Sequence, residues 1–295
     1  MQSSASLRGL TWQELEITGS SDIACELDAF LTSCQLGGWV VEAEEPQLCW
    51  VVYLPCTGSW EERFSKVLHG VRELGGDCQF RKNIVDEDWA NCWKQFYHPM
   101  RFGRHIVVCP SWEEFKPEVG DKVITLDPGM AFGTGAHAST AMCLEMLERV
   151  YSQNVPERIL DVGTGSGILA IAARLLGSRI IVASDSDPVA VKAARENFVA
   201  NHLTENCDLF EYVGVPLEKG CFPLVCANLV ASLLCRLAAD LVKATLPSGR
   251  LVLSGIVQER ADEVIEAFAE EGAEVVGRID KDDWVCLLVQ TKQSR

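Results

Sequence analysis

Residues 158–167 read Arg-Ile-Leu-Asp-Val-Gly-Thr-Gly-Ser-Gly, an apolar run that ends in a glycine-rich turn. An apolar helical pattern, Ile168 to Leu176, follows directly. Glycine suits such a turn because the backbone must change direction sharply and let a ligand approach its amides without a Cβ in the way. A strand, a loop and a helix N-terminus with unpaired N–H groups therefore meet at one point. We expect a nucleotide-like cofactor to bind there.

A second predicted strand, Arg179 to Ala183, places an acidic residue near this loop. It is followed by Ser-Asp-Ser-Asp-Pro, so that Asp185 lies 22 residues after Gly163. A carboxylate at this distance along the chain can accept hydrogen bonds from both ribose hydroxyls. Glycine-rich turns between a strand and a helix also occur for packing alone, and Asp185 is what favours the cofactor interpretation.

The spacing of the glycines distinguishes between two cofactors that use this half-fold. Gly163, Gly165 and Gly167 alternate with other residues, and Asp161 precedes them. A carboxylate at Asp161 would repel a pyrophosphate, whereas the methionine part of S-adenosylmethionine carries an ammonium group that a nearby acid can help to hold. The pattern favours S-adenosylmethionine and leaves a dinucleotide-dependent oxidoreductase as the alternative.

Length and composition limit the class of protein. The chain has 295 residues, 48% of them hydrophobic, and a formal net charge of −16. This length predicts two domains. No run approaches the ~20 apolar residues that cross a bilayer and no leader pattern opens the sequence, so we expect a cytoplasmic protein without membrane contact. The acidity disfavours nucleic acid and favours a basic protein partner, although a role in solubility alone would also explain it.

The cysteines and histidines show no spacing typical of a metal site. Thirteen cysteines are scattered without a Cys-x-x-Cys pair, and the five histidines lack His-x-x-x-His spacing. We therefore expect mostly buried, reduced cysteines and a reaction without a metal ion.

The first 85 residues alternate as strand, helix, strand, strand, helix and strand, with turn signals between the apolar runs. This order predicts a small α+β, ferredoxin-like domain over residues 1–85. Residues 86–117 are expected to be a linker that begins with a connecting helix, on which Trp89 and Trp93 share one face and serve in packing.

Strands and helices alternate over residues 118–295, which indicates an α/β domain. The last two predicted strands, Ala273–Ile279 and Trp284–Gln290, are expected to pair antiparallel. The fold class is therefore a doubly wound, Rossmann-like sheet with a C-terminal hairpin. Because dehydrogenase halves usually continue in parallel, the hairpin again favours a methyltransferase.

A second glycine-rich stretch, residues 127–140, runs into a helix. Gly133 permits movement, Phe132 offers an apolar face, and the hydroxyls of Thr134 and Thr140 can hydrogen-bond the methionine part of the cofactor. We expect this stretch to fold over the bound cofactor.

An ordinary helix-capping loop is the alternative for this stretch, with Ser139 or a neighbour as the N-cap. A lone histidine beside a capping loop more often serves hydrogen bonding or packing than base catalysis, and we expect this of His137.

Asn228 ends a predicted apolar strand, where open α/β sheets place reacting groups. Its amide oxygen can accept hydrogen bonds from an amine without taking its proton. Methyl transfer needs alignment and exclusion of water rather than a strong base. A lysine has a pKa of about 10.4 in water, and a partly dry pocket favours its neutral form. We therefore assign Asn228 as the catalytic residue that holds a neutral amine in line.

Together these motifs resemble the bacterial ribosomal protein L11 methyltransferases, the PrmA family. The resemblance runs nearly from end to end. It rests on residues 96–103, 110–112, 126–135, 161–167, 185–188 and 227–229. The second glycine-rich stretch is the most specific of these motifs.

The resemblance implies an N-terminal substrate-recognition domain, a linker that lets it swing, and a class I methyltransferase domain. The implied reaction is methylation of lysine ε-amines and the N-terminal α-amine of large-subunit ribosomal protein L11. Thr140, Gly163, Asp185 and Asn228 match cofactor-binding positions of the family. The chain departs from the family pattern at Ala138-Ser139 and at Leu229-Val230, which affects the loop and the amine pocket.

Besides the dinucleotide-dependent oxidoreductase, two further alternatives to this function remain open at this stage. The first is a methyltransferase of another basic protein, because the N-terminal domain selects the substrate. The second is a catalytically silent ribosome-binding factor that retains the fold. The sequence leaves the oligomeric state open, and we expect a monomer.

Overall fold

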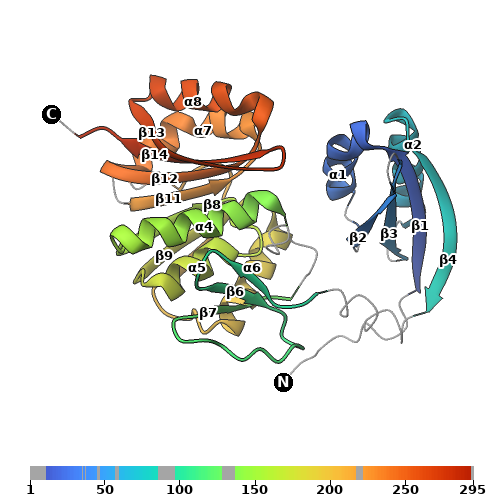
Figure 1. Ribbon diagram of the computed structural model, residues 1–295, viewed down its shortest axis with the longest axis horizontal. Helices are drawn as coiled ribbons and strands as arrows, with labels where there is room; N and C mark the ends of the chain where they lie inside the picture. Colours follow the sequence, from blue (N-terminus) through green and yellow to red (C-terminus); the bar gives the residue numbers. More distant parts are fainter. Residues whose placement is uncertain are drawn as a thin grey trace. The chain divides into compact units, whose positions relative to one another are not determined.

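The computed structural model describes residues 11–34, 36, 38–44, 47–56, 60–85, 97–127, 137–216 and 222–293. The chain divides into two compact units, Met1–Tyr97 and His98–Arg295 (Figure 1). The predicted connecting helix with Trp89 and Trp93 lies outside the described residues.

The N-terminal unit is built on a four-stranded antiparallel sheet in the order β2-β3-β1-β4. Its elements are β1 (Thr11–Ser20), η1 (Ser21–Ile23), α1 (Ala24–Ser33), β2 (Gly38–Glu44), β3 (Gln47–Pro55), α2 (Trp60–Glu73) and β4 (Asp77–Val85). The predicted order of strand, helix, strand, strand, helix and strand is therefore the observed one.

The core of this unit follows the two periodicities of its elements. Leu15 and Ile17, two residues apart on β1, are fully buried, and so are Val67 and Val71, four residues apart on α2. A spacing of two places strand side chains on one face, and a spacing of four does so on a helix.

The C-terminal unit is built on a seven-stranded sheet in the order β10-β9-β8-β11-β12-β14-β13. Its strands are β8 (Arg158–Val162), β9 (Ile180–Asp185), β10 (Cys207–Glu211), β11 (Phe222–Asn228), β12 (Thr245–Val257), β13 (Ala273–Lys281) and β14 (Trp284–Thr291). The strands from β10 to β12 in this order are parallel, and β14 lies antiparallel between β12 and β13. The predicted doubly wound sheet with a C-terminal hairpin is confirmed.

Helices cover both faces of this sheet (Figure 1). They are α4 (Ala138–Gln153), α5 (Ile168–Leu176), α6 (Pro188–Ala200), α7 (Ala231–Ala244) and α8 (Ala261–Glu270), with a short 3-10 turn η3 (Gln258–Arg260) before α8. In the part of the chain that the structure describes, no helix combines the length and the apolar character needed to cross a membrane.

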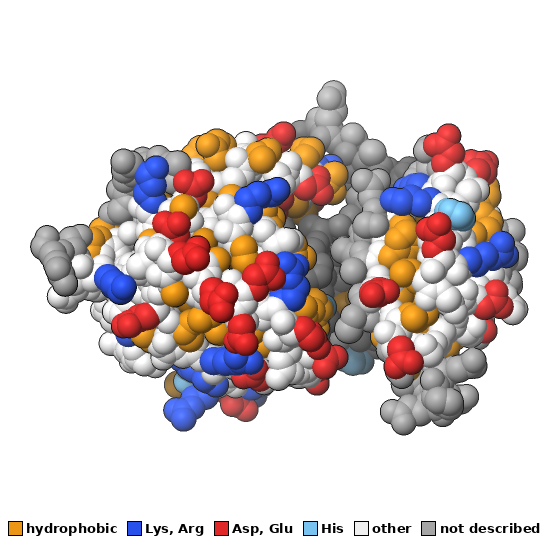
Figure 2. Space-filling model, turned by 90° about the horizontal axis from the view of Figure 1, so that it is seen from above, with side chains coloured by type: hydrophobic (Ala, Val, Ile, Leu, Met, Phe, Trp, Pro, Cys, Tyr) orange, Lys and Arg blue, Asp and Glu red, His pale blue; other side chains and the backbone are white. Residues whose placement is uncertain are grey.

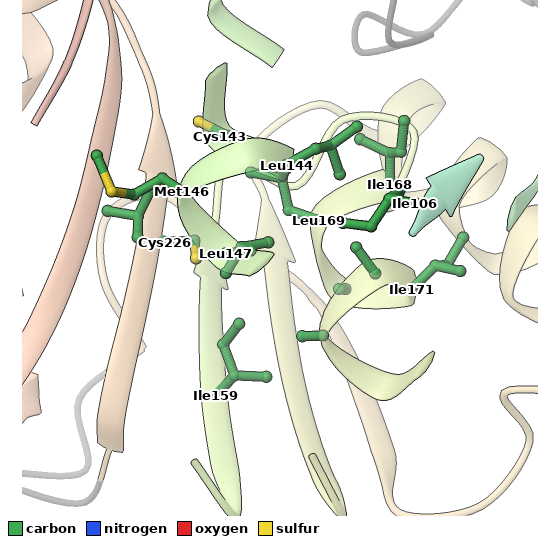
Figure 3. Close-up of a cluster of buried hydrophobic side chains, with 14 of the residues drawn as sticks. Ile106, Cys143, Leu144, Met146, Leu147, Ile159, Ile168, Leu169, Ile171 and Cys226 are labelled. Carbon is green, nitrogen blue, oxygen red and sulfur yellow. The ribbon is translucent and has the colours of Figure 1, made fainter. Parts of the chain in front are cut away.

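Alternate residues along the strands of the sheet pack into two separate hydrophobic cores, one on each face. On β11, Leu224 and Cys226 pack with α4 and α5, whereas Val225 packs with α7 and α8. Figure 3 shows Leu144 of α4 close to Leu169 of α5 within the first of these cores. A strand buried on both faces carries an unbroken apolar run, which is why residues 224–227 show no polar alternation.

A three-stranded sheet joins the same unit. It consists of β5 (Met100–Phe102), β6 (Ile106–Cys109) and β7 (Lys122–Thr125), with β6 in the middle. Ile106 is fully buried in the core that also contains Ile168 and Ile171 of α5 (Figure 3). The C-terminal unit therefore begins earlier than the expected residue 118, because β6 buries its apolar side chains against this unit.

Candidate active site

The glycine loop, residues 163–167, connects β8 to α5. Gly163, Gly165 and Gly167 have φ angles of +71°, +56° and +83°. A Cβ atom at Gly163 would lie 2.4 Å from Cδ2 of Leu229. The left-handed backbone and this close approach together explain the need for glycine.

Hydrogen bonds hold the glycine loop against the end of β9. The N–H groups of Gly163 and Thr164 donate to the carbonyl oxygen of Ser184 at 2.8 and 3.0 Å. The N–H of Gly165 donates to Oδ2 of Asp185 at 2.9 Å. Asp185 is the last residue of β9 and is half-buried, so the predicted acidic side chain lies directly beside the loop.

Asp161 lies within β8 and is fully buried. The hydroxyl of Thr164 donates to its Oδ2 at 2.6 Å, whereas its Oδ1 has no hydrogen-bond partner within the described part of the chain. Burial raises the pKa of Asp161 to about 7, and the negative charge of Asp185 adds to this rise. The hydrogen bond from Thr164 opposes it, and so does the backbone N–H of Ala170. A cation beside the loop would favour the carboxylate form of Asp161.

Asn228 is the last residue of β11, the strand that pairs with β8. Its Nδ2 donates to the hydroxyl of Thr140 at 3.3 Å, and this bond sets the orientation of the amide. Its Oδ1 is buried and has no hydrogen-bond partner among the described residues. Because buried polar atoms nearly always have partners, the unpartnered oxygens of Asn228 and Asp161 indicate a place for a ligand that supplies donors or positive charge.

The structure thus brings most of the predicted site residues to the ends of β8, β9 and β11 and the start of α4. They are Thr140, Asp161, Gly163, Gly165, Asp185 and Asn228. The remaining predicted residues, Phe132, Gly133 and Thr134, lie outside the described residues.

The helix that follows the second glycine-rich stretch is capped by His137. Its Nδ1 accepts the N–H of Ser139 at 3.2 Å, and its ring lies edge-on to that of Trp284 with the centroids 4.6 Å apart. His137, two residues before Ser139, is therefore the N-cap, and the expected role of His137 in hydrogen bonding and packing is confirmed.

Sequence reasoning missed two residues of this site. Thr164 was not singled out, although a hydroxyl three residues after Asp161 in a tight turn is placed to hydrogen-bond it. Ser184 has a buried Oγ without a hydrogen-bond partner within the described ranges. It gave no signal, because a serine at the end of a buried strand looks like any small residue.

Comparison with known families gives the enzyme class. Residues 15–292 match the model of the family described as ribosomal protein L11 methyltransferase (PrmA). The chain belongs to the ribosomal protein L11 methyltransferase family. Family membership and the observed sheet together confirm the class I methyltransferase fold, and they decide against a dinucleotide-dependent oxidoreductase.

Individual members of the ribosomal protein L11 methyltransferase family cover much of the chain. The protein of that name from Geobacter sulfurreducens is 47% identical and covers 71% of this chain and 68% of its own length. The one from Chloroflexus aurantiacus is 37% identical and covers 86% of this chain and 88% of its own. The crystal structure of a ribosomal protein L11 methylase from Lactobacillus delbrueckii subsp. bulgaricus matches over 67% of this chain and 100% of that chain, with 32% identity and a TM-score of 0.61.

Proposed function

We propose that this protein transfers methyl groups from S-adenosylmethionine to lysine ε-amines and to the N-terminal α-amine of ribosomal protein L11. The family and the relatives in these comparisons carry the name of that substrate. The observation that carries the proposal is a pair of buried oxygens, on Asp161 and Asn228, that have no hydrogen-bond partner among the described residues and lie on adjacent strands beside a glycine loop.

The residues present fit S-adenosylmethionine. The carboxylate of Asp185 is placed to accept hydrogen bonds from ribose hydroxyls, and the backbone of Gly163 and Gly165 allows close approach at the loop. Asp161 gains a stabilised negative charge when the cationic cofactor lies beside the loop. Phe132, Gly133 and Thr134 stay predicted contributors from the covering stretch.

Asn228 holds the substrate amine in this proposal. The bond from Nδ2 to Thr140 turns Oδ1 away from the hydroxyl. Oδ1 has no hydrogen-bond partner in the described part of the chain and can accept an N–H of the amine. We propose the carbonyl oxygen of the following residue, Leu229, as the second acceptor, because it lies close to the same point as Oδ1: a Cβ at Gly255 would be 2.6 Å from the former and 3.0 Å from the latter. Two neutral acceptors hold an uncharged amine without removing its proton.

The chemistry requires only alignment from the protein. When bound, the cofactor would supply a methyl group on a sulfonium. The lysine ammonium would give up one proton to water on entering the pocket, its lone pair would form the N–C bond while the C–S electron pair stays on sulfur, and the product would leave as the methylated ammonium. Holding the amine in line and excluding water are what the residues at the ends of β8 and β11 contribute.

Charge supports a lysine-bearing protein as the substrate. The net charge of −16 favours approach of a basic partner. On the face shown in Figure 2, acidic side chains are spread among basic and apolar ones. We propose that the N-terminal domain selects this partner, and that the reaction takes place in the cytoplasm, where ribosomes assemble.

Mass spectrometry of purified ribosomal protein L11 incubated with this enzyme and S-adenosylmethionine tests the proposal. We expect mass gains of ~14 Da steps on lysine and N-terminal amines, and Asn228→Ala should lower kcat by at least about 100-fold at saturating cofactor. Asn154→Ala, the same change at an exposed position, is the control and should keep wild-type turnover.

Two outcomes would contradict this assignment. Near-normal turnover of Asn228→Ala would show that Asn228 does not hold the substrate amine. No mass gain on ribosomal protein L11, with cofactor binding established by calorimetry, would instead point to another basic protein as the substrate.

A further inference from the structure

We infer that Gly255 is a positioning residue that leaves room for the two oxygens that accept the substrate amine. The inference rests on the proposed function of Asn228. Gly255 lies in β12 with a φ of +79°, at the point where the pairing of β12 with β14 shifts register between Leu253 and Ile256. The β-bulge explains why β12 turns at this residue.

The pairing of β11 with β12 brings Gly255 against the amine site. Asn228 lies opposite Ser254 in the parallel ladder. The N–H of Leu229 donates to the carbonyl oxygen of Ser254 at 2.9 Å. The residue after Ser254 is therefore fixed beside the backbone of Leu229.

A side chain at Gly255 would collide with both proposed acceptors. Its Cβ would lie 2.6 Å from the carbonyl oxygen of Leu229 and 3.0 Å from Oδ1 of Asn228. The first distance is shorter than real Cβ contacts, and the second is tighter than most of them, so that the Asn228 oxygen would have to shift by a few tenths of an ångström. The Leu229 oxygen belongs to the backbone, which the bond to Ser254 holds in place, so the contact cannot be relieved by a change of rotamer.

Leu229 is held from its other side by the glycine loop. Its Cδ2 lies where a Cβ of Gly163 would come within 2.4 Å. Glycines on two different elements thus leave room for one residue. Gly163 makes room for the side chain of Leu229, and Gly255 makes room for the carbonyl group of Leu229. Leu229 links the loop proposed to bind cofactor with the oxygens proposed to bind the amine.

Gly255 has no side chain and can affect the reaction only through the Leu229 carbonyl oxygen and Oδ1 of Asn228. A methyl group in its place would move the Leu229 carbonyl, the Asn228 amide, or both. Displacement of a positioning group by about 1 Å lowers turnover by about 100-fold. Binding of the cofactor at Asp185 and the glycine loop does not involve Gly255 and should stay close to that of the wild type.

Gly255→Ala tests this role, with Gly272→Ala as the matched control. Gly272 has a φ of +80°, so alanine meets the same backbone strain there, but no atom of the described residues lies within 4 Å of its Cβ position. We expect kcat for a lysine-containing L11 protein to fall about 100-fold in Gly255→Ala and to change less than about 2-fold in Gly272→Ala. Calorimetry with S-adenosylmethionine should show a much smaller change in Kd than in kcat for Gly255→Ala, and an unchanged Kd for Gly272→Ala.

A second variant measures the contact itself. In an Asn228→Ala background one of the two oxygens is absent, so adding Gly255→Ala should lower kcat by a smaller factor than it does in the wild type. Equal cost in the two backgrounds, or a folded Gly255→Ala enzyme with wild-type kcat, would overturn the inference. So would a Gly255→Ala protein that stays unfolded at saturating cofactor while Gly272→Ala folds, because Gly255 would then serve folding.

The wild-type enzyme separates this inference from the proposed function. If the wild type methylates no lysine of L11, the proposed function fails before any variant is compared. If the wild type is active and Asn228→Ala is not, a wild-type kcat of Gly255→Ala would exclude the proposed role of Gly255 and leave that of Asn228 intact.

Discussion

Replacing Asp161 by asparagine is expected to stabilise the cofactor-free protein and to weaken cofactor binding. Asp161 is fully buried, and burial raises its pKa from 3.8 to about 7. The folded protein therefore keeps a proton that the unfolded chain releases. Its stability falls as the pH rises from the unfolded pKa through the folded pKa.

The magnitude follows from the size of this shift. One pKa unit corresponds to about 1.4 kcal/mol, so ionisation of Asp161 lowers the free energy of unfolding by about 4 kcal/mol in total. About 2 kcal/mol of this loss falls between about pH 5 and about pH 7. Asparagine does not titrate, can still accept the hydroxyl of Thr164 through its amide oxygen, and avoids the loss.

Urea unfolding of the wild type and Asp161→Asn at several pH values measures the effect. The difference in the free energy of unfolding should grow by about 2 kcal/mol in favour of the variant from about pH 5 to about pH 7. Asp208→Asn, at an exposed aspartate on β10, should show no such trend. A difference that stays constant with pH would refute the buried, protonated carboxyl.

The same variant should bind S-adenosylmethionine more weakly, because it lacks the charge that a cationic ligand stabilises. Calorimetry at about pH 8, where the wild-type carboxyl is ionised, gives the largest contrast. Equal affinity of variant and wild type would show that Asp161 contributes nothing to the cofactor.

Two further substitutions test packing and a polar link. Gly167→Ala should lower the free energy of unfolding by about 3 kcal/mol, because its φ is +83° and its Cβ would lie 2.6 Å from Cε1 of Phe198. In urea unfolding Gly272→Ala should lose only the stability that corresponds to the strained backbone. Equal losses in the two variants would contradict the contact with Phe198. Asn201→Ala should lower the free energy of unfolding by about 2 kcal/mol, since the Asn201 side chain accepts the N–H of Thr125 at 2.8 Å and donates to the Thr125 carbonyl oxygen at 2.7 Å. Hydrogen exchange at Thr125 should accelerate, and unchanged exchange would argue against this role.

Strong local patterns allowed much of the C-terminal sheet to be predicted. The apolar run before Gly163 and the helical pattern after it are visible in the chain itself, and β8 and α5 lie where expected. The extent of β12 was less accessible. Its predicted range was Leu251 to Ser254, whereas the strand runs from Thr245 to Val257. Pro247, Ser248 and Gly249 resemble a loop locally, and Ser248 has a φ of +59°. Only the pairing of Thr245 with Phe222 of β11, across a register shift, extends the strand past them.

Long-range contacts set the parts of the site that the sequence did not reveal. Asn228 was predicted from its place at a strand end, but the bond that turns its amide comes from Thr140 on a distant helix. Gly255 reads as an ordinary glycine after a strand, because its φ and its neighbours follow from a bulge opposite β14. Such features depend on which strands become neighbours, and periodicity alone does not encode that.

The position of β14 has a consequence for how the enzyme is made. This strand is the last of the sheet in chain order, yet it pairs with β12 on one side and β13 on the other. A nascent chain that ends before residue 284 leaves β13 without its neighbour and the bulge at Gly255 without the strand opposite it. Methyl transfer at the proposed amine site therefore depends on β14, the strand of this sheet that the ribosome makes last.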